Sequence, residues 1–407
     1  MSKWEKVKLG ALANYINGYA FKPKDWVKDG LPIIRIEQLK NPLTSYDYYS
    51  GKVPQNNLIF KGDLIFSWSA SFVAKIWNMN DAVLNQHLYK VIPKEDNNIF
   101  FLKHLLDYHI IKFENDAHGS TMKHLKRNEL LDYLVNIPLD KSIQTRIAEI
   151  LSTADKAIED SEKLIAKYKR MKTGMMQDLL TKGIDENGNI RSEATHKFKD
   201  SPLGRIPVEW EVKRLEEVCI YVSDGSHFSP KAREEGFVIG NVKDMEEFDF
   251  NYNSCTKISI RDYEVLVSQN CQPLKGDILL SKDGTIGKVF VFNKDKKIVI
   301  LSSIAILRPS DKYSSLYLSY LLKSQYFNKN LIKFISGSAL KRIVIRDIKK
   351  MIFPLSSDER EQNRICDYLS EIDSLVFVET ETLSKLKRLK AGLMNDLLSG
   401  KVEVVDN

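Results

Sequence analysis

The sequence repeats itself with a period of about half its length. Residues 169–180 read Lys-Arg-Met-Lys-Thr-Gly-Met-Met-Gln-Asp-Leu-Leu, and residues 387–398 read Lys-Arg-Leu-Lys-Ala-Gly-Leu-Met-Asn-Asp-Leu-Leu. The offset is 387 − 169 = 218 residues, and the same offset relates Gln144 to Gln362. A chain of 407 residues with this pattern is expected to fold as two copies of one unit in tandem.

The similarity between the two copies is uneven. The tripeptide Lys-Gly-Asp occurs at 61–63 and again at 275–277, but the stretches 10–57 and 216–270 share little beyond an apolar rhythm. The end of each copy matches much more closely. This pattern favours a common scaffold that presents two different recognition surfaces, and the alternative is drift in unconstrained loops.

The matching end of each copy predicts a long helix. Residues 142–173 and 358–391 contain neither Gly nor Pro, and their composition favours helix. Apolar residues recur there at alternating spacings of three and four, which is the heptad pattern of a coiled coil. The residues expected to pair the helices are Ile147, Leu151, Ile158, Ile165 and Tyr168 in the first copy and Ile365, Leu369, Val376, Leu383 and Leu386 in the second.

Polar residues interrupt this apolar seam at Ser161, Lys172, Glu379 and Lys390. At such positions polar side chains fix register and partner more than they add stability. Each helix could pack on its own domain, but two matched narrow seams in one chain favour packing against each other. A helix of roughly 36 residues is about 54 Å long. An antiparallel pair of such helices would act as a spacer between the two variable regions.

The variable regions combine short β-type runs, such as 63–66 and 277–280, with helical stretches at 100–112 and 315–327. We therefore predict an α+β fold: a tandem duplication with two mixed α/β domains separated by two long antiparallel coiled-coil helices. The expected segments are a first variable domain at 1–141, a first helix at 142–181, a linker at 182–209, a second variable domain at 210–357 and a second helix at 358–399.

Composition excludes several classes of protein. With 43% hydrophobic and 28% charged residues, the chain is neither collagen-like nor a disulfide scaffold. Its 4 cysteines are far apart and form no Cys-x-x-Cys pair, so we expect no metal site. No run approaches the ~20 apolar residues of a membrane span, and we expect a cytoplasmic protein without membrane contact. The net charge of +7 is only a weak indication of nucleic-acid binding.

Motifs of catalysis are missing from the sequence. It contains no G-x-G-x-x-G, P-loop, G-x-S-x-G or H-E-x-x-H pattern. Residues 136–139, Asn-Ile-Pro-Leu, faintly resemble the N-P-P-[YF] loop of adenine methyltransferases, but the second proline, the aromatic residue and a glycine-rich cofactor loop are absent. We therefore expect no catalytic residue and no cofactor bound by this chain itself.

Polar loops at equivalent places in the two copies are the first candidates for DNA contacts. Residues 281–288 follow a predicted strand and contain an Asp-Gly turn, for which a plain hairpin is the structural alternative. The first copy lacks that glycine, so the loop keeps its position while its chemistry changes. Such side chains can donate to phosphates or reach base edges. The candidates are Ser67, Trp68 and Ser69, with Ser281, Lys282, Asp283, Thr285 and Lys288 in the second copy.

A second pair of loops opens with Gly-Ser and continues into basic residues, as a phosphate clamp would. A solvated charged face is the alternative. Lys123 and Lys341 are related by the 218-residue offset and are the leading candidates. The full set is Ser120, Thr121, Lys123, Lys126 and Arg127 in the first copy, and Ser338, Lys341 and Arg342 in the second.

Taken together, these features resemble the DNA specificity subunit of type I restriction-modification systems. Each variable region precedes a helix that closes on Lys-Arg-x-Lys-x-Gly-x-Met-x-Asp-Leu-Leu. Further motifs occur in the family's order: residues 198–207 before Trp210, the Lys-Gly-Asp tripeptides, the turn 283–287, and Glu361-Gln362-x-x-Ile365. The resemblance covers the whole chain.

Two departures from the family's pattern are local. Ser142-Ile143-Gln144 stands in place of the usual Glu-Gln pair, and Trp68-Ser69 stands in place of the Asp-Gly turn. Because of the second departure, the family pattern does not identify the contact loop of the first domain.

The resemblance implies a function that the residues alone do not give. Family members carry two target recognition domains, each of which reads one half of a bipartite asymmetric site in double-stranded DNA, and antiparallel helices set the gap. They are non-catalytic. They recruit two methyltransferase (M) subunits that carry S-adenosylmethionine, and restriction (R) subunits that use ATP and Mg. We expect the same partners and cofactors here, with the cofactors on the partner subunits.

Two other classes of function are weighed against this one. A coiled-coil scaffold that binds only protein would show no sequence-selective DNA binding and little dependence on salt, whereas DNA affinity falls steeply with salt. A stand-alone methyltransferase or nuclease would be active as a single purified chain, and the missing cofactor loop argues against it.

Overall fold

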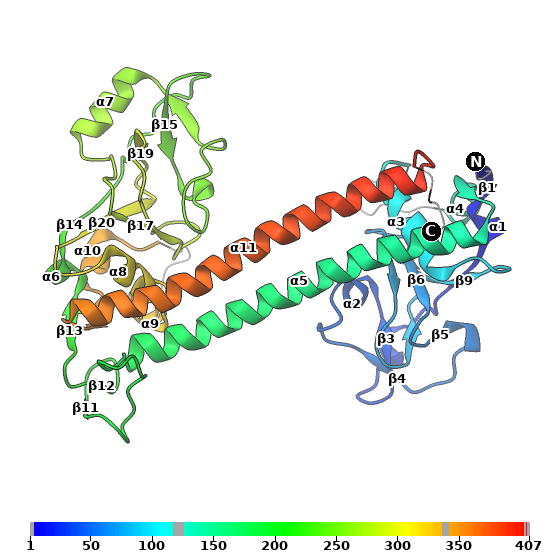
Figure 1. Ribbon diagram of the computed structural model, residues 1–407, viewed down its shortest axis with the longest axis horizontal. Coiled ribbons are helices and arrows are strands. Elements are labelled where there is room, and N and C mark those ends of the chain that lie inside the picture. The colour runs from blue at the N-terminus through cyan, green and yellow to red at the C-terminus, as the bar shows by residue number, and fades with distance from the viewer. Residues whose placement is uncertain (1–3, 117–125, 336–341, 403, 405–407) are drawn as a thin grey trace. The chain divides into compact units, whose positions relative to one another are not determined.

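The computed structural model describes residues 4–116, 126–335, 342–402 and 404. The chain divides into two compact units, one formed by residues 1–164 with 379–407 and the other by residues 165–378 (Figure 1). Each unit contains one variable region and one part of each long helix. The units are described separately.

Two long helices carry the residues of the predicted seam. Helix α5 spans Lys141–Thr181 and helix α11 spans Glu359–Leu398. Both run unbroken through Gly174 and Gly392, where a side chain would meet no atom of a neighbouring element. Since neither glycine is needed for a close approach, both are tolerated inside the helix at a modest cost in helix propensity.

The first unit contains two four-stranded sheets and a strand pair. The central antiparallel sheet has the order β2 (Ala13–Asn17), β9 (Leu88–Pro93), β6 (Leu64–Ser67) and β7 (Val73–Ile76). The smaller sheet has the order β4 (Tyr48–Tyr49), β3 (Leu31–Ile34), β8 (Ala82–Leu84) and β5 (Leu58–Ile59), and the pair joins β1 (Trp4–Lys8) to β10 (Leu134–Pro138).

Helices cover the sheets of the first unit. Helix α3 packs on the central sheet and lies in one hydrophobic core with the start of α5. The helices of this unit, besides α5 and α11, are α1 (Leu9–Leu12), α2 (Ile36–Lys40), α3 (Ile99–Asp116) and α4 (Arg127–Asp132), with 3-10 turns η1 (Pro23–Asp25) and η2 (Gln55–Asn57).

The second unit repeats this plan. Its central sheet has the order β14 (Cys219–Asp224), β20 (Ile304–Pro309), β17 (Ile278–Ser281) and β18 (Val289–Val291). Its smaller sheet has the order β16 (Thr256–Ile258), β15 (Phe237–Gly240) and β19 (Ile298–Ile300). Two strand pairs complete it, β13 (Glu211–Arg214) with β21 (Ile352–Leu355) and β11 (Phe198–Lys199) with β12 (Ile206–Pro207).

The helix expected at 315–327 is two helices. Helix α8 ends at Leu322 and helix α9 begins at Gln325. Ser324 causes the break, because its hydroxyl accepts a hydrogen bond from the amide of Tyr326 at 3.2 Å and so caps α9. The helices of this unit, besides α5 and α11, are α6 (Leu215–Val218), α7 (Ile260–Ser268), α8 (Ser315–Leu322), α9 (Gln325–Ile335) and α10 (Ile345–Lys350), with 3-10 turn η3 (Val242–Asp244).

In the first unit α5 and α11 run side by side in opposite directions (Figure 1). Ser161 donates a hydrogen bond to Glu379 at 2.6 Å, and further along α5 towards its start Asp155 pairs with Lys390 at 2.5 Å. Because the partner number on α11 rises as the number on α5 falls, the pairing is antiparallel. Ser161 and Glu379 are also counterparts in the repeat, 218 residues apart.

In the second unit the same two helices pair antiparallel through their other ends. Leu179 and Leu180 share a core with Ile365 and Leu369. Lys172 forms an ion pair with Asp373. This pair is the repeat counterpart of Lys390 with Asp155, since Lys172 and Asp373 lie 218 residues from them in the sequence.

None of the ten predicted seam residues has an exposed side chain. Ile147, Leu151, Ile365, Leu369 and Val376 are buried. Ile158, Ile165, Tyr168, Leu383 and Leu386 are half-buried, as befits a seam two helices wide with solvent on both flanks.

The linker segment of the chain is packed into the second unit. Ile184, Leu203 and Ile206 lie in the same hydrophobic core as Trp210. This part of the chain is therefore an ordered component of the unit and not a free tether.

Glu361 fixes that segment to the start of α11. Its buried carboxylate accepts hydrogen bonds from the indole of Trp210 at 3.0 Å, the amide of Ile184 at 2.9 Å and the hydroxyl of Ser356 at 2.6 Å, and it pairs with Arg191. A buried carboxylate is stable only when its lone pairs are satisfied in this way. The first copy has Ile143 at the counterpart position, where the sequence departs from the family's Glu-Gln pair.

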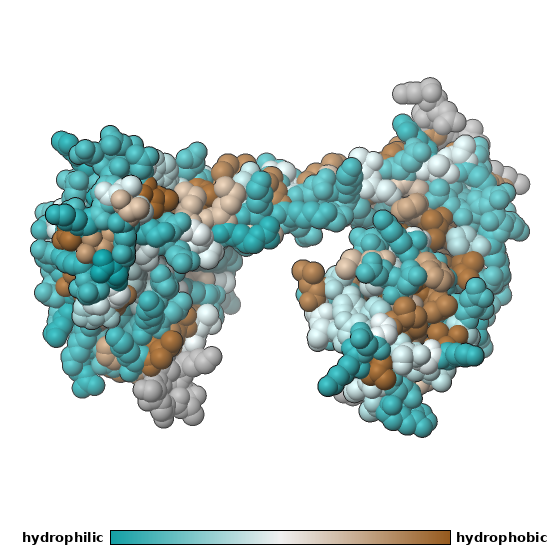
Figure 2. Space-filling view, turned by 90° about the horizontal axis from the view of Figure 1, so that it is seen from below, coloured by the Kyte–Doolittle hydropathy of each residue, from teal (hydrophilic) through white to brown (hydrophobic). Residues whose placement is uncertain are grey.

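Hydrophilic residues cover most of the face drawn in Figure 2, with hydrophobic ones between them. Among the described residues, no helix combines the length and the apolar character needed to cross a membrane.

Replacing Glu361 with Ala is expected to lower the free energy of unfolding by about 3 kcal/mol or more, because buried donors lose their acceptor. Urea denaturation of the full chain measures the effect. Glu359→Ala is the matched control, since Glu359 lies exposed at the start of the same helix and its loss should cost no more than about 0.5 kcal/mol. Equal losses in the two variants would contradict the role given to Glu361.

Candidate nucleic-acid interface

The predicted contact loops occupy the same place on the two central sheets. In the first unit Ser67 lies opposite Leu88 across β6 and β9, and in the second Ser281 lies opposite Ile304 across β17 and β20. Both residues are the last of their strand before a hairpin. Trp68 and Lys282 are therefore structural counterparts.

The next strand extends this equivalence. Asn17 ends β2 opposite Tyr89, and Asp224 ends β14 opposite Ala305. A glycine follows each of them, Gly18 and Gly225 in turn.

These two glycines are required by close packing of the backbone. A Cβ at Gly18 would lie 2.2 Å from the carbonyl oxygen of Asn85, and a Cβ at Gly225 would lie 2.1 Å from that of Ile300. Any other residue would push the two segments apart. In both units a glycine therefore allows the same close backbone contact beside the loop.

Lys282 of the second unit is only 1% exposed. Its ammonium forms an ion pair with Asp224 at 3.0 Å, which anchors the hairpin to the end of β14. We therefore withdraw Lys282 as a predicted DNA contact. Its charge is used inside the protein because a buried ammonium needs a partner.

Ser281 and Lys288 also have structural roles. The buried hydroxyl of Ser281 donates to the carbonyl of Thr285 at 2.6 Å and accepts from the amide of Lys288 at 2.8 Å, which closes the hairpin. The ammonium of Lys288 donates to the carbonyls of Val242 at 3.1 Å and Met245 at 2.7 Å. This loop is thus a plain hairpin turn, the structural alternative to a contact loop, and these two side chains stabilise it.

The structure brings the two predicted segments of the second unit together. Asp283 forms a β-bridge with Arg342, and their side chains lie 3.8 Å apart. The amide of Ile343 donates to the carbonyl of Lys282 at 2.8 Å. Thr285 and Arg342 are exposed, so these two candidates are available to a ligand at the surface.

Two exposed residues beside this hairpin were missed by sequence reasoning. Phe228 is 62% exposed, and the imidazole of the exposed His227 lies 3.4 Å from Asp224, the partner of Lys282. The turn is ordered by Ser226, whose hydroxyl accepts from the amide of Phe228 at 3.0 Å. The sequence signal for this turn is a glycine at the end of a strand, followed by polar and aromatic residues.

The first unit uses an aromatic residue where the second uses the Lys–Asp pair. The Trp68 indole donates to the carbonyl of Gln86 at 3.3 Å, and its ring centre lies 5.8 Å from that of Tyr89. Ser67 and Ser69 are buried: the first bonds the carbonyl of Ser71, and the second lies 3.4 Å from the His87 ring nitrogen. The two serines hold the hairpin, and Trp68 is half-buried.

Basic residues lie close to this hairpin as well. Arg127 donates to the carbonyl of Tyr15 at 3.2 Å. Burial raises the pKa of Tyr89, and the nearby Arg127 opposes that shift. Lys126 is exposed and lies 3.6 Å from Glu129. Both basic residues remain predicted contacts.

The remaining candidates fall outside the described residues. These are Ser120, Thr121, Lys123, Ser338 and Lys341. They stay predictions from the sequence.

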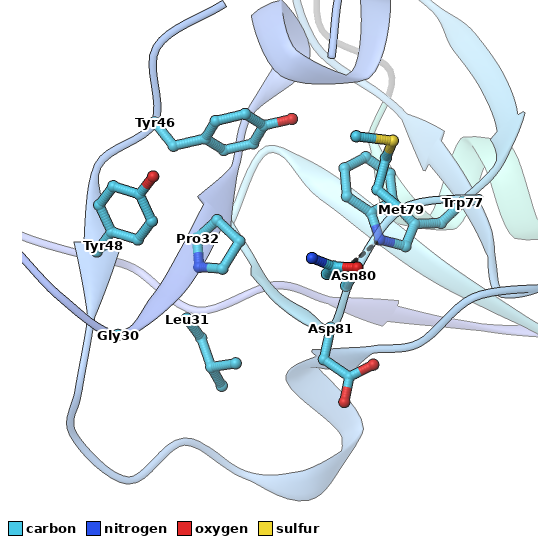
Figure 3. Close-up of a pocket in the computed structure, with 9 residues that line it drawn as sticks. All are labelled: Gly30, Leu31, Pro32, Tyr46, Tyr48, Trp77, Met79, Asn80 and Asp81. Atoms are coloured by element: carbon cyan, nitrogen blue, oxygen red, sulfur yellow. Dashed lines mark hydrogen bonds between the residues drawn. The ribbon is translucent and has the colours of Figure 1, made fainter. Parts of the chain in front are cut away.

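A pocket of about 640 Å³ opens at the smaller sheet of the first unit. Figure 3 shows the rings of Tyr46 and Tyr48 around Pro32, with the Trp77 indole bonded to the carbonyl of Asn80 at 2.8 Å. None of the predicted contact residues lines this pocket. It is therefore distinct from the predicted contact loops.

A half-buried polar cluster joins the first variable region to the long helices. On α3, Lys103 pairs with Asp107 at 2.9 Å and also with Asp155 of α5, which in turn pairs with Lys390 of α11. Three helices thus meet at one carboxylate. The four charges form pairs of opposite sign, and this pairing offsets the desolvation cost of their partial burial.

His104 lies buried beside this cluster. Its ring nitrogen Nε2 lies 3.1 Å from the hydroxyl of Ser152. Burial, together with the ammonium of Lys103, lowers the pKa of His104 to about 3, although Asp155 acts in the opposite direction. The imidazole is therefore neutral in the folded protein. Among the described residues, no group of His, Cys, Asp and Glu is arranged to hold a metal ion.

The family of the chain follows from a match to a known domain. The type I restriction modification DNA specificity domain matches residues 1–169 and again residues 207–388, one match for each copy of the repeat. The chain belongs to the type I restriction-modification DNA specificity family. The resemblance stated from the sequence motifs is confirmed.

Relatives extend over nearly the whole chain. The EcoBI specificity subunit of Escherichia coli is 25% identical over 418 residues, which cover 98% of this chain and 86% of that protein. The MjaVIII specificity subunit of Methanocaldococcus jannaschii is 26% identical over 420 residues, which cover 98% of this chain and 93% of that protein.

Solved structures share the fold. The type I restriction-modification S subunit from M. genitalium superimposes with a TM-score of 0.62 at 14% identity, covering 99% of this chain and 97% of that one. A chain from a structure of type I R-M complex assembly gives a TM-score of 0.53 at 19% identity, with 97% of each chain covered. The predicted fold class is confirmed.

The specificity-family chain is expected to lose stability as pH falls below about 6.5, because unfolding then lets His104 take up a proton that the folded state excludes. The contribution of His104 approaches about 1.4 kcal/mol per pH unit roughly one unit below that point. Urea denaturation between pH 8 and pH 5 measures it. The slope should be shallower in His104→Gln, and parallel pH profiles for the two proteins would contradict a neutral buried His104.

Proposed function

We propose that the two recognition units each read one half of a bipartite asymmetric site in double-stranded DNA. One observation carries the proposal: the units share a strand frame but differ in chemistry at the same hairpin. The pair Lys282–Asp224 in the second unit occupies the positions that Trp68 and Asn17 hold in the first. Different loops on one frame suit the reading of different base sequences.

Exposed groups next to each hairpin supply the proposed contacts. In the second unit these are Thr285, Arg342, His227 and Phe228, and in the first they include Arg127. Arginine can bind a guanine edge or a phosphate with two hydrogen bonds, and hydroxyl groups can bind either. Buried Lys282 and half-buried Lys288 hold the loop in shape so that these groups are preorganised.

The chain acts, in this proposal, as the non-catalytic subunit of a cytoplasmic complex. The long helices dock two methyltransferase subunits, which bind S-adenosylmethionine, and restriction subunits bind ATP and Mg. The sequence supports the assignment because it holds no catalytic or cofactor motif.

The paired helices are proposed to set the spacing between the half-sites. Antiparallel pairing in each unit supports this, with Asp155 to Lys390 in the first and Asp373 to Lys172 in the second. A coiled coil held by such polar contacts has a defined register and therefore a defined length.

Exchange of one recognition region tests independent readout. Replacing residues 1–140 with the corresponding region of a relative is expected to change one half-site and leave the other intact. Mapping methylated adenines in DNA exposed to the assembled complex gives both half-sites and the gap. A change in both half-sites, or in neither, would refute the proposal.

Lengthening both helices tests the spacer. One heptad inserted into α5 and one into α11 adds about 10 Å, or ~3 bp at 3.4 Å per pair. The gap in the methylated site should grow by that amount. The control is an insertion into one helix only, which breaks the register and should abolish methylation. An unchanged gap in the double insertion would refute the spacer role.

A further inference from the structure

A second pocket, of about 560 Å³, lies wholly within the second unit. It is lined by strand β18, helix α8, helix α11 and the segment that precedes Phe250. Its volume lies in the range of sites that bury a ligand or a partner's side chains. None of the predicted DNA-contact residues lines it.

Large apolar side chains surround this pocket and remain exposed. Phe377 and Val378 of α11 are 55% and 60% exposed, and Phe248 and Leu316 on the opposite walls are 44% and 37% exposed. Single exposed apolar residues are ordinary, but several around one concave site mark an interaction surface.

An ammonium group stands in the wall of the pocket. The Lys323 nitrogen lies 5.8 Å from the ring centre of Phe248 and 5.9 Å from that of Tyr320. Among the described residues, no carboxylate oxygen lies within 4.0 Å of this nitrogen. Burial lowers the pKa of Lys323 and the neighbouring Lys172 lowers it further, although Asp373 and Glu247 act in the opposite direction.

The first copy has a carboxylate at the position equivalent to Lys323. Phe101 and Leu102 of α3 correspond to Tyr317 and Leu318 of α8, which are buried in the same way at an offset of 216 residues. At that offset Asp107 is the counterpart of Lys323.

The charges balance in the first copy only. There Lys103 and Lys390 face Asp107 and Asp155, two cations against two carboxylates. Ser319 replaces Lys103 in the second copy.

In the second copy two cations share one carboxylate. Lys172 pairs with Asp373, which also accepts a hydrogen bond from the Tyr320 hydroxyl at 2.9 Å, and Lys323 is the second cation. Asp249 also lines the pocket, but its carboxylate is bonded to Lys294. This junction is therefore one carboxylate short of its counterpart, and the position that lacks it opens into the pocket.

We propose that this pocket holds an acidic side chain, flanked by apolar side chains, of a protein partner. The carboxylate pairs with Lys323, and the apolar neighbours pack on Phe248 and Phe377. Charge complementarity favours this occupant, because an apolar ligand alone would leave the half-buried ammonium without a counter-ion.

The partner binds once to each chain. The counterparts of Phe377 and Val378 in the first copy, 218 residues earlier, are Glu159 and Asp160. The repeat therefore provides the apolar wall on α11 but not on α5. This separates the pocket from any surface that two identical subunits would share through the repeat.

Fluorine NMR on the full chain tests the proposal with defined probes. The first probe is the capped peptide Leu-Glu-Leu-(4-fluorophenylalanine), compared with its Gln form, and the second is 4-fluorophenylacetate. The Glu peptide is expected to bind more tightly than the Gln peptide by about tenfold, the value of one charged hydrogen bond, and more tightly than the free acid.

Two variants locate the binding. Lys323→Met removes the charge, keeps the length of the side chain and should abolish the preference for Glu. Phe377→Ser removes an exposed apolar wall and should weaken binding of both peptides. Glu159→Ser, at the repeat counterpart of Phe377, is the matched control and should change nothing. Circular dichroism checks that each variant folds.

Three results would overturn the proposal. Equal binding of the Glu and Gln peptides would remove the role of Lys323. Binding of 4-fluorophenylacetate without binding of the peptide would make the pocket a small-molecule site. Binding of the Glu peptide that survives both variants would place the occupant elsewhere.

Discussion

The antiparallel contact between α5 and α11 is the constraint on which the rest of the structure depends. An apolar seam alone would allow the helices to slide by a heptad, because each step re-forms similar contacts. The ion pair of Asp155 with Lys390, and its counterpart of Asp373 with Lys172, can form only in one register. Ser161 bonded to Glu379 adds the same restriction where a residue meets its own repeat counterpart.

Each of these carboxylates also binds a side chain from the recognition region of its own unit. Asp155 binds Lys103 of α3, and Asp373 accepts a hydrogen bond from Tyr320 of α8. In each unit one carboxylate therefore fixes both the register of the helices and the attachment of the domain. The two junctions use different donors, so the recognition regions can diverge while the helical scaffold keeps its geometry.

Sequence periodicity was sufficient for the scaffold and insufficient for the loops. The heptads leave every predicted seam residue buried or half-buried, because helical spacing alone decides which face is apolar. No such period governs a hairpin: Lys282 looked available but is buried against Asp224, a contact between residues 58 positions apart. The break at Ser324 was also missed, since a hydroxyl cap inside an apolar run leaves no periodic signal.

The buried lysine explains how one frame can carry two chemistries. Replacing the Lys282–Asp224 pair by Trp68 and Asn17 exchanges an anchored ion pair for an aromatic ring held by Tyr89 and the Gln86 carbonyl. In both units a glycine after the neighbouring strand, Gly18 or Gly225, keeps that strand end close to the backbone of Asn85 or Ile300. Because the anchor is internal, residues at the tip of the hairpin are free to vary without loss of the fold. A specificity protein requires that separation, since its contact residues must change while its support stays rigid.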